Sequence, residues 1–165
     1  MSNRSKKIFL ALSIVVPFLM YCMYYYGMMV KNAPYKFSEF ESLTFKYGEG
    51  DSLVNQYYSK TGEFQYLNVG DSVVTTKVKL NKKDLLYLHR KAADLGFWNF
   101  PEKMHGAREA GKPQVRYYLE LKYQRKTKYL EFDADYIGKP KLVEAAKMLI
   151  KEVDSRIKEA ESRYN

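Results

Sequence analysis

The apolar and polar positions first separate a long uncharged run near the N-terminus from the rest of the chain. From Ile8 to Val30 there is no Asp, Glu, Lys or Arg. A helix rises about 1.5 Å per residue, so these 23 residues would form a helix roughly 35 Å long. The hydrocarbon core of a bilayer is about 30 Å thick. We therefore predict a transmembrane helix over residues 8–30.

Two other interpretations of this run are a cleaved export signal and a lipid-modified signal. A cleaved signal has an apolar region of roughly 7–15 residues followed by a small-x-small pattern. The nearest candidate pattern here, ending at Ala33, has Lys31 where a small residue is needed. Cys22 is preceded by Tyr21, whereas an acylated cysteine usually follows a small residue. Both observations favour a retained, single-pass anchor.

The charges that flank the run predict its orientation. Arg4, Lys6 and Lys7 precede it without any acidic residue, whereas basic and acidic residues are balanced just after it. Positive charge collects on the cytoplasmic side of a membrane. Residues 1–7 are therefore expected to be a cytoplasmic tail, and the C-terminal part to be extracytoplasmic, on the periplasmic side of the inner membrane if the source is a bacterium. The three consecutive tyrosines at 24–26 fit the aromatic belt of the outer boundary.

One face of the predicted span carries residues that an ordinary anchor does not need. Ser13, Pro17, Tyr21, Tyr24 and Met28 recur at steps of three and four. Hydrogen bonds between membrane helices contribute about 0.6–2 kcal/mol each. We predict that Ser13, Tyr21, Tyr24 and Met28 form a partner-binding face for another membrane subunit. In the alternative interpretation, Ser13 bonds its own helix backbone and Tyr21 reaches toward the boundary.

Beyond a linker at residues 31–41, the pattern changes to alternation with a period of two. "SLTFKY", residues 42–47, alternates apolar and polar side chains as a half-buried strand does. Residues 55–80 continue this alternation in three segments. Turn residues separate the segments at Thr61-Gly62 and Gly70-Asp71, so four strands are expected before the first helix.

The period lengthens to that of a helix between Asn81, a good N-cap, and Gly96, which suits a left-handed C-cap. The compact aromatic cluster "GFWNF" follows. Two more alternating runs, residues 113–124 and 126–134, predict a hairpin that turns near Arg125-Lys126.

A final helix is predicted to open at Pro140 and to carry an apolar stripe as far as Ile157. Four strands, a helix, two strands and a helix indicate an α+β fold, a two-layer domain with a mostly antiparallel sheet and helices on one face. We place this extracytoplasmic domain at residues 42–157 and a polar C-terminal tail at residues 158–165.

The charge balance limits the expected partners. There are 28 Lys and Arg against 19 Asp and Glu, a formal net charge of +9. Removing the three cations of the predicted cytoplasmic tail leaves a net charge of +6 on the extracytoplasmic part. This charge favours attraction to anionic lipid headgroups, but it also increases solubility. We expect the lipid bilayer and membrane protein subunits as partners. Nucleic acid is not expected, because the domain is placed outside the cytoplasm and carries no aromatic ribonucleoprotein motif.

The longest polar stretch without periodicity, "PEKMHGAREAGKPQ" at residues 101–114, is one candidate site. Lys103, His105, Arg108 and Lys112 would give such a loop the charge to bind an anionic group. The competing interpretation is a simple connector.

A second candidate is "EFDADY", which sets Glu131, Asp133 and Asp135 at alternate positions. Three such carboxylates could bind a divalent cation, but they lack the spacing of a calcium loop, so a solvated strand face is preferred. His89 lies opposite the Leu85 stripe and is expected to face solvent or to lie at the rim of the core. No cofactor, metal ion or catalytic residue is predicted.

These features together indicate a non-enzymatic, membrane-anchored interaction protein, an accessory subunit of a larger membrane complex of the cell envelope. The alternative is a ligand-binding module for glycans or anionic surface molecules, because the 16 tyrosines and the basic residues also suit such surfaces. A hydrolase that uses paired carboxylates is the third hypothesis.

Overall fold

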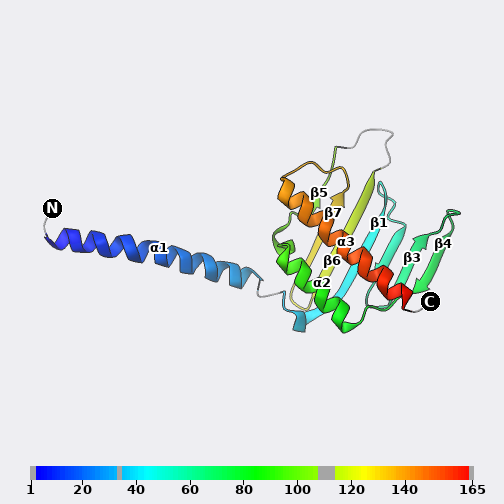
Figure 1. The fold of residues 1–165 in the computed structure, drawn as a ribbon, viewed down its shortest axis with the longest axis horizontal. Helices are drawn as coiled ribbons and strands as arrows, with labels where there is room; N and C mark the ends of the chain where they lie inside the picture. Colours follow the sequence, from blue (N-terminus) through cyan, green and yellow to red (C-terminus); the bar gives the residue numbers. More distant parts are fainter. Residues whose placement is uncertain (1–2, 33–34, 108–113, 164–165) are drawn as a thin grey trace. The chain divides into compact units, whose positions relative to one another are not determined.

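The computed structural model of the protein describes residues 3–32, 35–107 and 114–163, which form two compact units, Met1–Lys36 and Phe37–Asn165 (Figure 1). The first unit is one helix, α1, Asn3–Asn32. Over Asn3–Val30 it is long and apolar enough to cross a membrane, and an 18-residue stretch of it has a mean hydropathy of 2.0 and no buried residue. A signal sequence also meets these criteria of length and composition.

The second unit is built on a seven-stranded sheet with the order β4-β3-β2-β1-β6-β7-β5 (Figure 1). The strands are β1 Phe40–Glu49, β2 Asn55–Tyr58, β3 Glu63–Leu67, β4 Val73–Lys77, β5 Lys103–Met104, β6 Val115–Tyr123 and β7 Thr127–Asp133. All neighbours are antiparallel except β5 and β7. The predicted α+β class and mostly antiparallel sheet are confirmed. The sequence did not predict β5, because two residues cannot show a period.

Two helices, α2 Lys82–Asp94 and α3 Pro140–Ser162, lie across the same face of the sheet, as predicted (Figure 1). The predicted cap of α2 is present: the Asn81 side chain accepts hydrogen bonds from the backbone N–H groups of Lys83 and Asp84, at 2.8 and 2.9 Å. The Asp84 carboxylate accepts in return from the Asn81 N–H at 3.0 Å. Gly96 has a φ of 75°, the left-handed conformation expected after the helix.

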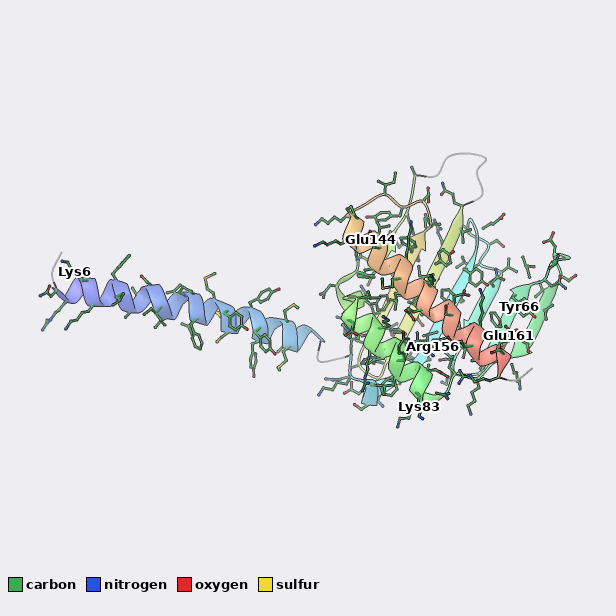
Figure 2. The ribbon with its side chains drawn as sticks, in the orientation of Figure 1. Lys6, Tyr66, Lys83, Glu144, Arg156 and Glu161 are labelled. Atoms are coloured by element: carbon green, nitrogen blue, oxygen red, sulfur yellow. The ribbon has the colours of Figure 1, made fainter. Side chains whose placement is uncertain are left out.

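Polar contacts hold α2 against α3. The Arg156 guanidinium of α3 lies over the ring of Tyr87, 4.1 Å from its centroid (Figure 2). The Tyr87 hydroxyl donates to the Glu152 carboxylate at 2.9 Å, and Arg163 donates to Asp84 at 2.8 Å. Nearer the C-terminal end of α2, Lys91 forms an ion pair with Glu152 at 3.8 Å, so both halves of α2 are held against α3 and the two helices form one layer.

The core lies between this helical layer and the sheet. Its buried apolar residues come from the central strands, from both helices and from the 3-10 helix η2, Phe97–Asn99, which places Phe97 and Trp98 inside. The sheet contributes Leu43, Phe45, Tyr57, Leu119, Leu121 and Phe132, and α3 contributes Leu149, Val153 and Ile157. The predicted apolar faces of the strands are therefore the faces that α2 and α3 cover.

The helix α1 begins inside the predicted tail and ends inside the predicted linker, and two boundaries of the second unit also differ from the predicted ones. A short 3-10 helix, η1 Phe37–Glu39, and the start of β1 lie within the stretch predicted as a linker. At the other end α3 continues through Ser162, into the stretch predicted as a polar tail. Ala160 is fully buried, so packing of the last turn against the domain carries the helix past its polar residues.

Candidate functional site

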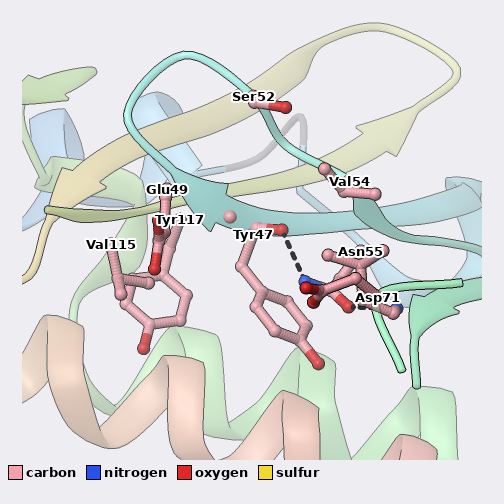
Figure 3. Close-up of a pocket in the computed structure, with 10 residues that line it drawn as sticks. Tyr47, Glu49, Ser52, Val54, Asn55, Asp71, Val115 and Tyr117 are labelled. Carbon is pink, nitrogen blue, oxygen red and sulfur yellow. Dashed lines mark hydrogen bonds between the residues drawn. The ribbon is translucent and has the colours of Figure 1, made fainter. Parts of the chain in front are cut away.

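A cavity of about 640 Å³ opens at the end of the sheet where β1 ends and β2 and β6 begin (Figure 3). We call it the tyrosine cleft. It is lined by Tyr47, Gly48, Glu49, Ser52, Val54, Asn55, Leu67, Asp71, Val115 and Tyr117. A volume of this size lies within the usual range for ligand pockets, about 300–1,000 Å³.

Two loops shape the rim of the tyrosine cleft. Near the end of β1 a side chain at Gly48 would overlap the backbone carbonyl of Ser52 in the β1–β2 loop, so glycine permits the loop to fold back there. In the β3–β4 hairpin the Asn68 side-chain oxygen accepts hydrogen bonds from the N–H groups of Gly70 and Ser72, at 2.9 and 3.0 Å. The next residue within that turn, Asp71, has a φ of 52°, which aspartate tolerates better than most residues.

Aromatic rings form the wall of the cleft. Tyr47 and Tyr117 are directly opposite each other on β1 and β6, with ring centroids 6.0 Å apart and planes 29° apart. Asn55 fixes the neighbouring backbone, because its side-chain N–H donates to the Tyr47 carbonyl and its side-chain oxygen accepts from the Leu67 N–H, both at 3.1 Å. The rings are thus held by cross-strand pairing rather than by a flexible loop.

The environment of Tyr47 keeps its hydroxyl protonated. Burial raises the pKa of the Tyr47 phenol, and the negative charge of Asp154 on α3 raises it further, although Lys158 acts in the opposite direction. A neutral phenol can donate a hydrogen bond. The cleft therefore presents a hydroxyl donor beside two ring faces.

The lining of the cleft selects against one kind of ligand. It contains the carboxylates Glu49 and Asp71 and no Lys or Arg among the described lining residues. An anion would be repelled. Ring faces with hydrogen-bonding groups at their edges suit a neutral hydroxylated ligand or an amine.

The predicted solvated face of "EFDADY" is wrong for Asp133, which is 2% exposed. Its two oxygens accept from Arg116 Nε at 2.6 Å and from Nη2 at 3.0 Å, and it also accepts from the Gly106 N–H at 3.1 Å. Burial acts to raise the pKa of Asp133, but the hydrogen bonds from Arg116 and Gly106 outweigh it and the pKa is lowered. Strand alternation could not reveal this pairing, since Arg116 is on another strand.

The other two carboxylates of this motif have different surroundings. Glu131 accepts from His105 Nε2 at 2.9 Å. Asp135 lies beyond the end of β7. Within residues 3–32, 35–107 and 114–163, no group of three His, Cys, Asp or Glu side chains could hold a metal ion.

Only part of the predicted anion-binding loop is described. Lys103 lies on β5, opposite Glu131 in the sheet register, and His105 contacts the same glutamate. Arg108 and Lys112 lie outside the described residues. Anion binding by this loop therefore stays a prediction. In the structure its His105 contacts the carboxylate of Glu131.

The predicted face of the membrane helix lies on α1. The Ser13 hydroxyl donates to the Phe9 carbonyl one turn earlier, at 2.8 Å, as the alternative interpretation expected. Tyr21, Tyr24 and Met28 are exposed within their unit. Whether they bind a partner helix stays a prediction.

His89 lies at the rim of the core and is half-buried. Its Nδ1 is 2.7 Å from the Tyr123 hydroxyl, and its ring packs near Phe37 and Trp98. Burial lowers the pKa of His89, and the nearby Arg90 lowers it further. A neutral imidazole at neutral pH fits a structural role.

No protein family model matches the chain, and a search of curated proteins finds no match either. The tyrosine cleft was not predicted from the sequence. Tyr47 and Tyr117 were identified as members of apolar strand faces, and the turns at Gly48 and Gly70 as strand ends. Only the register of β1 against β6 brings them to one cavity.

Proposed function

We propose that the protein is a single-pass membrane protein with a cytoplasmic N-terminus and an extracytoplasmic domain, and that it is an accessory subunit of a larger membrane complex of the cell envelope. The observation that carries this proposal is the combination of an apolar, wholly exposed α1 with a separately packed α+β unit. Such an architecture brings a soluble domain to a membrane and leaves a helix free to associate.

Pro17 supports a docking role for the helix. Proline has no backbone N–H, so the Ser13 carbonyl one turn earlier lacks its usual helical donor. The Ser13 hydroxyl cannot replace that donor while it bonds the Phe9 carbonyl. Within lipid an unsatisfied carbonyl is costly, and a polar group from a neighbouring helix would relieve the cost.

The sheet face that α2 and α3 leave uncovered supports a second contact. Tyr118 and Tyr129 stack there with ring centroids 5.9 Å apart, and Lys46 lies over the Tyr58 ring at 5.1 Å. Tyrosines with mixed charges are typical of protein interfaces. We expect this face to contact the extracytoplasmic part of a partner subunit.

Co-purification in a mild detergent tests the proposal, and stoichiometric membrane proteins should accompany the full chain. The triple change Ser13→Leu, Tyr21→Leu and Tyr24→Leu removes three hydroxyls from the predicted face without lowering its hydrophobicity. It should weaken binding of the partners by about twentyfold if each of the three hydrogen bonds contributes about 0.6 kcal/mol.

Cys22→Leu with Tyr26→Leu is the matched control, since both residues lie on the opposite side of the same helix. It should leave recovery unchanged. Equal recovery with the triple variant and the control would mean that this face docks no helix. Purification of the full chain alone would rule out a stable complex.

The tyrosine cleft favours a second candidate, binding of a neutral glycan. Its stacked Tyr47 and Tyr117 and its rim carboxylates supply a ring face with acceptors beside it. Calorimetric titration of the full chain with neutral oligosaccharides tests this candidate. Glu49→Gln with Asp71→Asn should weaken such binding, whereas Glu144→Gln on α3, far from the lining, should not. Equal affinity in all three proteins, or no binding at all, would exclude it.

A further inference from the structure

A second cavity, of about 320 Å³, lies at the opposite end of the β2–β3 hairpin from the tyrosine cleft. We call it the lysine pocket. It is lined by Ser59, Lys60, Thr61, Gly62, Lys77, Val78 and Lys79. Three of its seven lining residues are lysines, and none is acidic.

The floor of the lysine pocket is a fixed piece of backbone. The Val78 N–H donates to the Gly62 carbonyl at 2.7 Å, and the Gly62 N–H donates to the Tyr58 carbonyl at 2.8 Å. Gly62 has a φ of 70°, and a side chain there would come within 3.2 Å of the Val78 carbonyl oxygen. Glycine therefore lets the turn after β2 and the chain after β4 meet closely, which brings the lysines of both segments to one place.

The three ammonium groups are not neutralised. Among the described residues, Lys60, Lys77 and Lys79 make no ion pair or hydrogen bond through their side chains. Nearby acids at this end of the sheet are engaged by other cations, in the ion pairs Glu39–Arg125, Glu41–Lys122 and Asp84–Arg163.

Glu63 is the exception, because it lies directly opposite Lys77 in the β3–β4 register. It makes no ion pair in the part of the chain that the structure describes. One carboxylate against three ammonium groups leaves the pocket with a net positive charge, and an incoming anion would supply the missing counter-charge.

We propose that the lysine pocket binds a phosphoryl group. A phosphate monoester carries more than one negative charge at neutral pH and has three acceptor oxygens. Three lysines can each donate to one of them, since an ammonium group binds phosphate as a point charge without a fixed geometry. The Ser59 hydroxyl stands in the same lining. It accepts from the Leu43 N–H at 2.7 Å, so its own proton can be donated to a phosphoryl oxygen.

The chain offers a lipid headgroup as one source of this group. The Ser59 N–H donates to the Leu43 carbonyl at 2.9 Å, so the pocket lies at the end of the sheet where β1 begins. β1 is the first strand after α1 in the chain, and a lipid headgroup can supply an anionic phosphoryl group. This source rests on the proposed membrane anchor, whereas a soluble phosphate ester does not.

Lysine acylation tests the proposal on the full chain. The protein is treated with an amine-reactive reagent and the modification of each lysine is measured by peptide mass spectrometry. Lys141, Lys147 and Lys151, which are exposed on α3, serve as reference lysines. One arm uses neutral detergent micelles with inorganic phosphate or glycerol 3-phosphate, and with chloride at equal ionic strength. The other uses vesicles of phosphatidylcholine, alone or mixed with phosphatidic acid, whose headgroup is a phosphate monoester.

Protection of Lys60, Lys77 and Lys79 relative to the reference lysines, by about threefold or more, supports the proposal. Protection by the soluble phosphates identifies a phosphate ester as sufficient. Protection confined to the anionic vesicles identifies the lipid headgroup. If phosphate protects in micelles but anionic vesicles do not, the pocket stands and the lipid source fails, which separates the pocket from the anchor. No selective protection in either arm, or equal protection of both lysine sets, overturns the proposal.

A charge-matched pair of variants gives an independent measurement. Lys60→Gln/Lys77→Gln/Lys79→Gln should bind the protecting phosphate about tenfold more weakly, whereas Lys141→Gln/Lys147→Gln/Lys151→Gln removes the same charge and should bind as the unchanged protein does. Glu63→Gln should tighten binding, since it removes the one acid beside the pocket. Equal weakening by both triple variants would show only a general effect of net charge and would contradict a local site.

Discussion

The tyrosine cleft and the lysine pocket occupy opposite ends of the same β2–β3 hairpin but are built in different ways. Cross-strand pairing of Tyr47 with Tyr117 makes the cleft, and residues of α3 influence it electrostatically. Two backbone segments, joined by the hydrogen bond between Val78 and Gly62, make the pocket, and its lysines extend from them. One site has aromatic walls and carboxylates, and the other has a hydrogen-bonded backbone floor and exposed cations.

Because of this difference, we expect substitutions at one site to change stability and substitutions at the other to change binding. At the cleft end the polar groups are packed against one another, as Arg116 and Asp133 show, so changing them should alter the free energy of unfolding. At the lysine pocket the side chains are exposed and unpaired, so changing them should alter affinity for an anion and little else. Changes to the backbone of the pocket, in contrast, should lower the free energy of unfolding as much as changes in a packed element do.

The largest expected effect is at the cleft end. Arg116→Ala would leave the Asp133 carboxylate buried without its ion-pair partner, and removing one member of a buried pair costs about 3–5 kcal/mol. The free energy of unfolding, measured by urea denaturation of the full chain in detergent, should fall by about that amount. Lys122→Ala, on the same strand and in an exposed pair with Glu41, should cost about 1 kcal/mol or less. Similar losses from both variants would contradict the distinction between a buried and an exposed pair.

Two glycines with positive φ then compare the turns at the two ends. Gly50→Ala, at a φ of 60° with open space around it, should cost about 1 kcal/mol for the left-handed conformation alone. Gly62→Ala should cost about 2 kcal/mol, because the added methyl also crowds the Val78 carbonyl. Urea denaturation measures both. If Gly62→Ala were the milder change, the close contact under the lysine pocket would not be important for stability.

Tyr47→Phe should have a smaller effect that depends on pH. The folded state raises the pKa of the Tyr47 phenol above its ordinary value near 10, so its contribution to stability is complete below about pH 10 and is lost as the pH rises toward the folded pKa. Near neutral pH the variant should differ by about 1 kcal/mol or less. Above pH 10 it should lose less stability than the unchanged protein. Parallel alkaline melting curves for the two proteins would show that Tyr47 titrates as if exposed.

The smallest expected effect comes from the lysine pocket itself. Without a ligand, Lys60→Gln/Lys77→Gln/Lys79→Gln should leave stability unchanged or raise it by about 0.5 kcal/mol at low salt, because it removes repulsion between like charges. The gain should vanish at high salt. Thermal melting at two ionic strengths measures it. A loss of more than about 1 kcal/mol would mean that the lysines hold the fold together and are not free for an anion.

Local patterns in the sequence predicted most of the elements. The alternation in "SLTFKY" located β1, the turn residues at Thr61-Gly62 and Gly70-Asp71 separated β2, β3 and β4, and Asn81 and Gly96 bounded α2. These signals work because each depends on neighbours within a few residues. The two-residue β5 has no such pattern, and the end of α3 was missed because burial of Ala160 is a tertiary effect.

The candidate sites were much less predictable. The sequence suggested the carboxylates of "EFDADY" and the loop at residues 101–114, but the solvation of Asp133 was predicted wrongly, because its partner Arg116 is 17 residues away on another strand. Tyr47 and Tyr117 were seen only as core-facing residues. Lys60, at the end of one hairpin, and Lys79, after another strand, had no sequence feature in common.

The sequence by itself determined the apolar helical run Ile8–Val30, the α+β class and the apolar face of each strand, because hydrophobic period and turn chemistry are local properties of the chain. The tertiary structure alone decided which polar groups meet. Strand register placed Tyr47 beside Tyr117 and Arg116 beside Asp133, and the contact of Gly62 with Val78 brought three lysines together. These contacts join residues that are far apart in the chain. Only the packed sheet and its turns determine which of these residues lie close together.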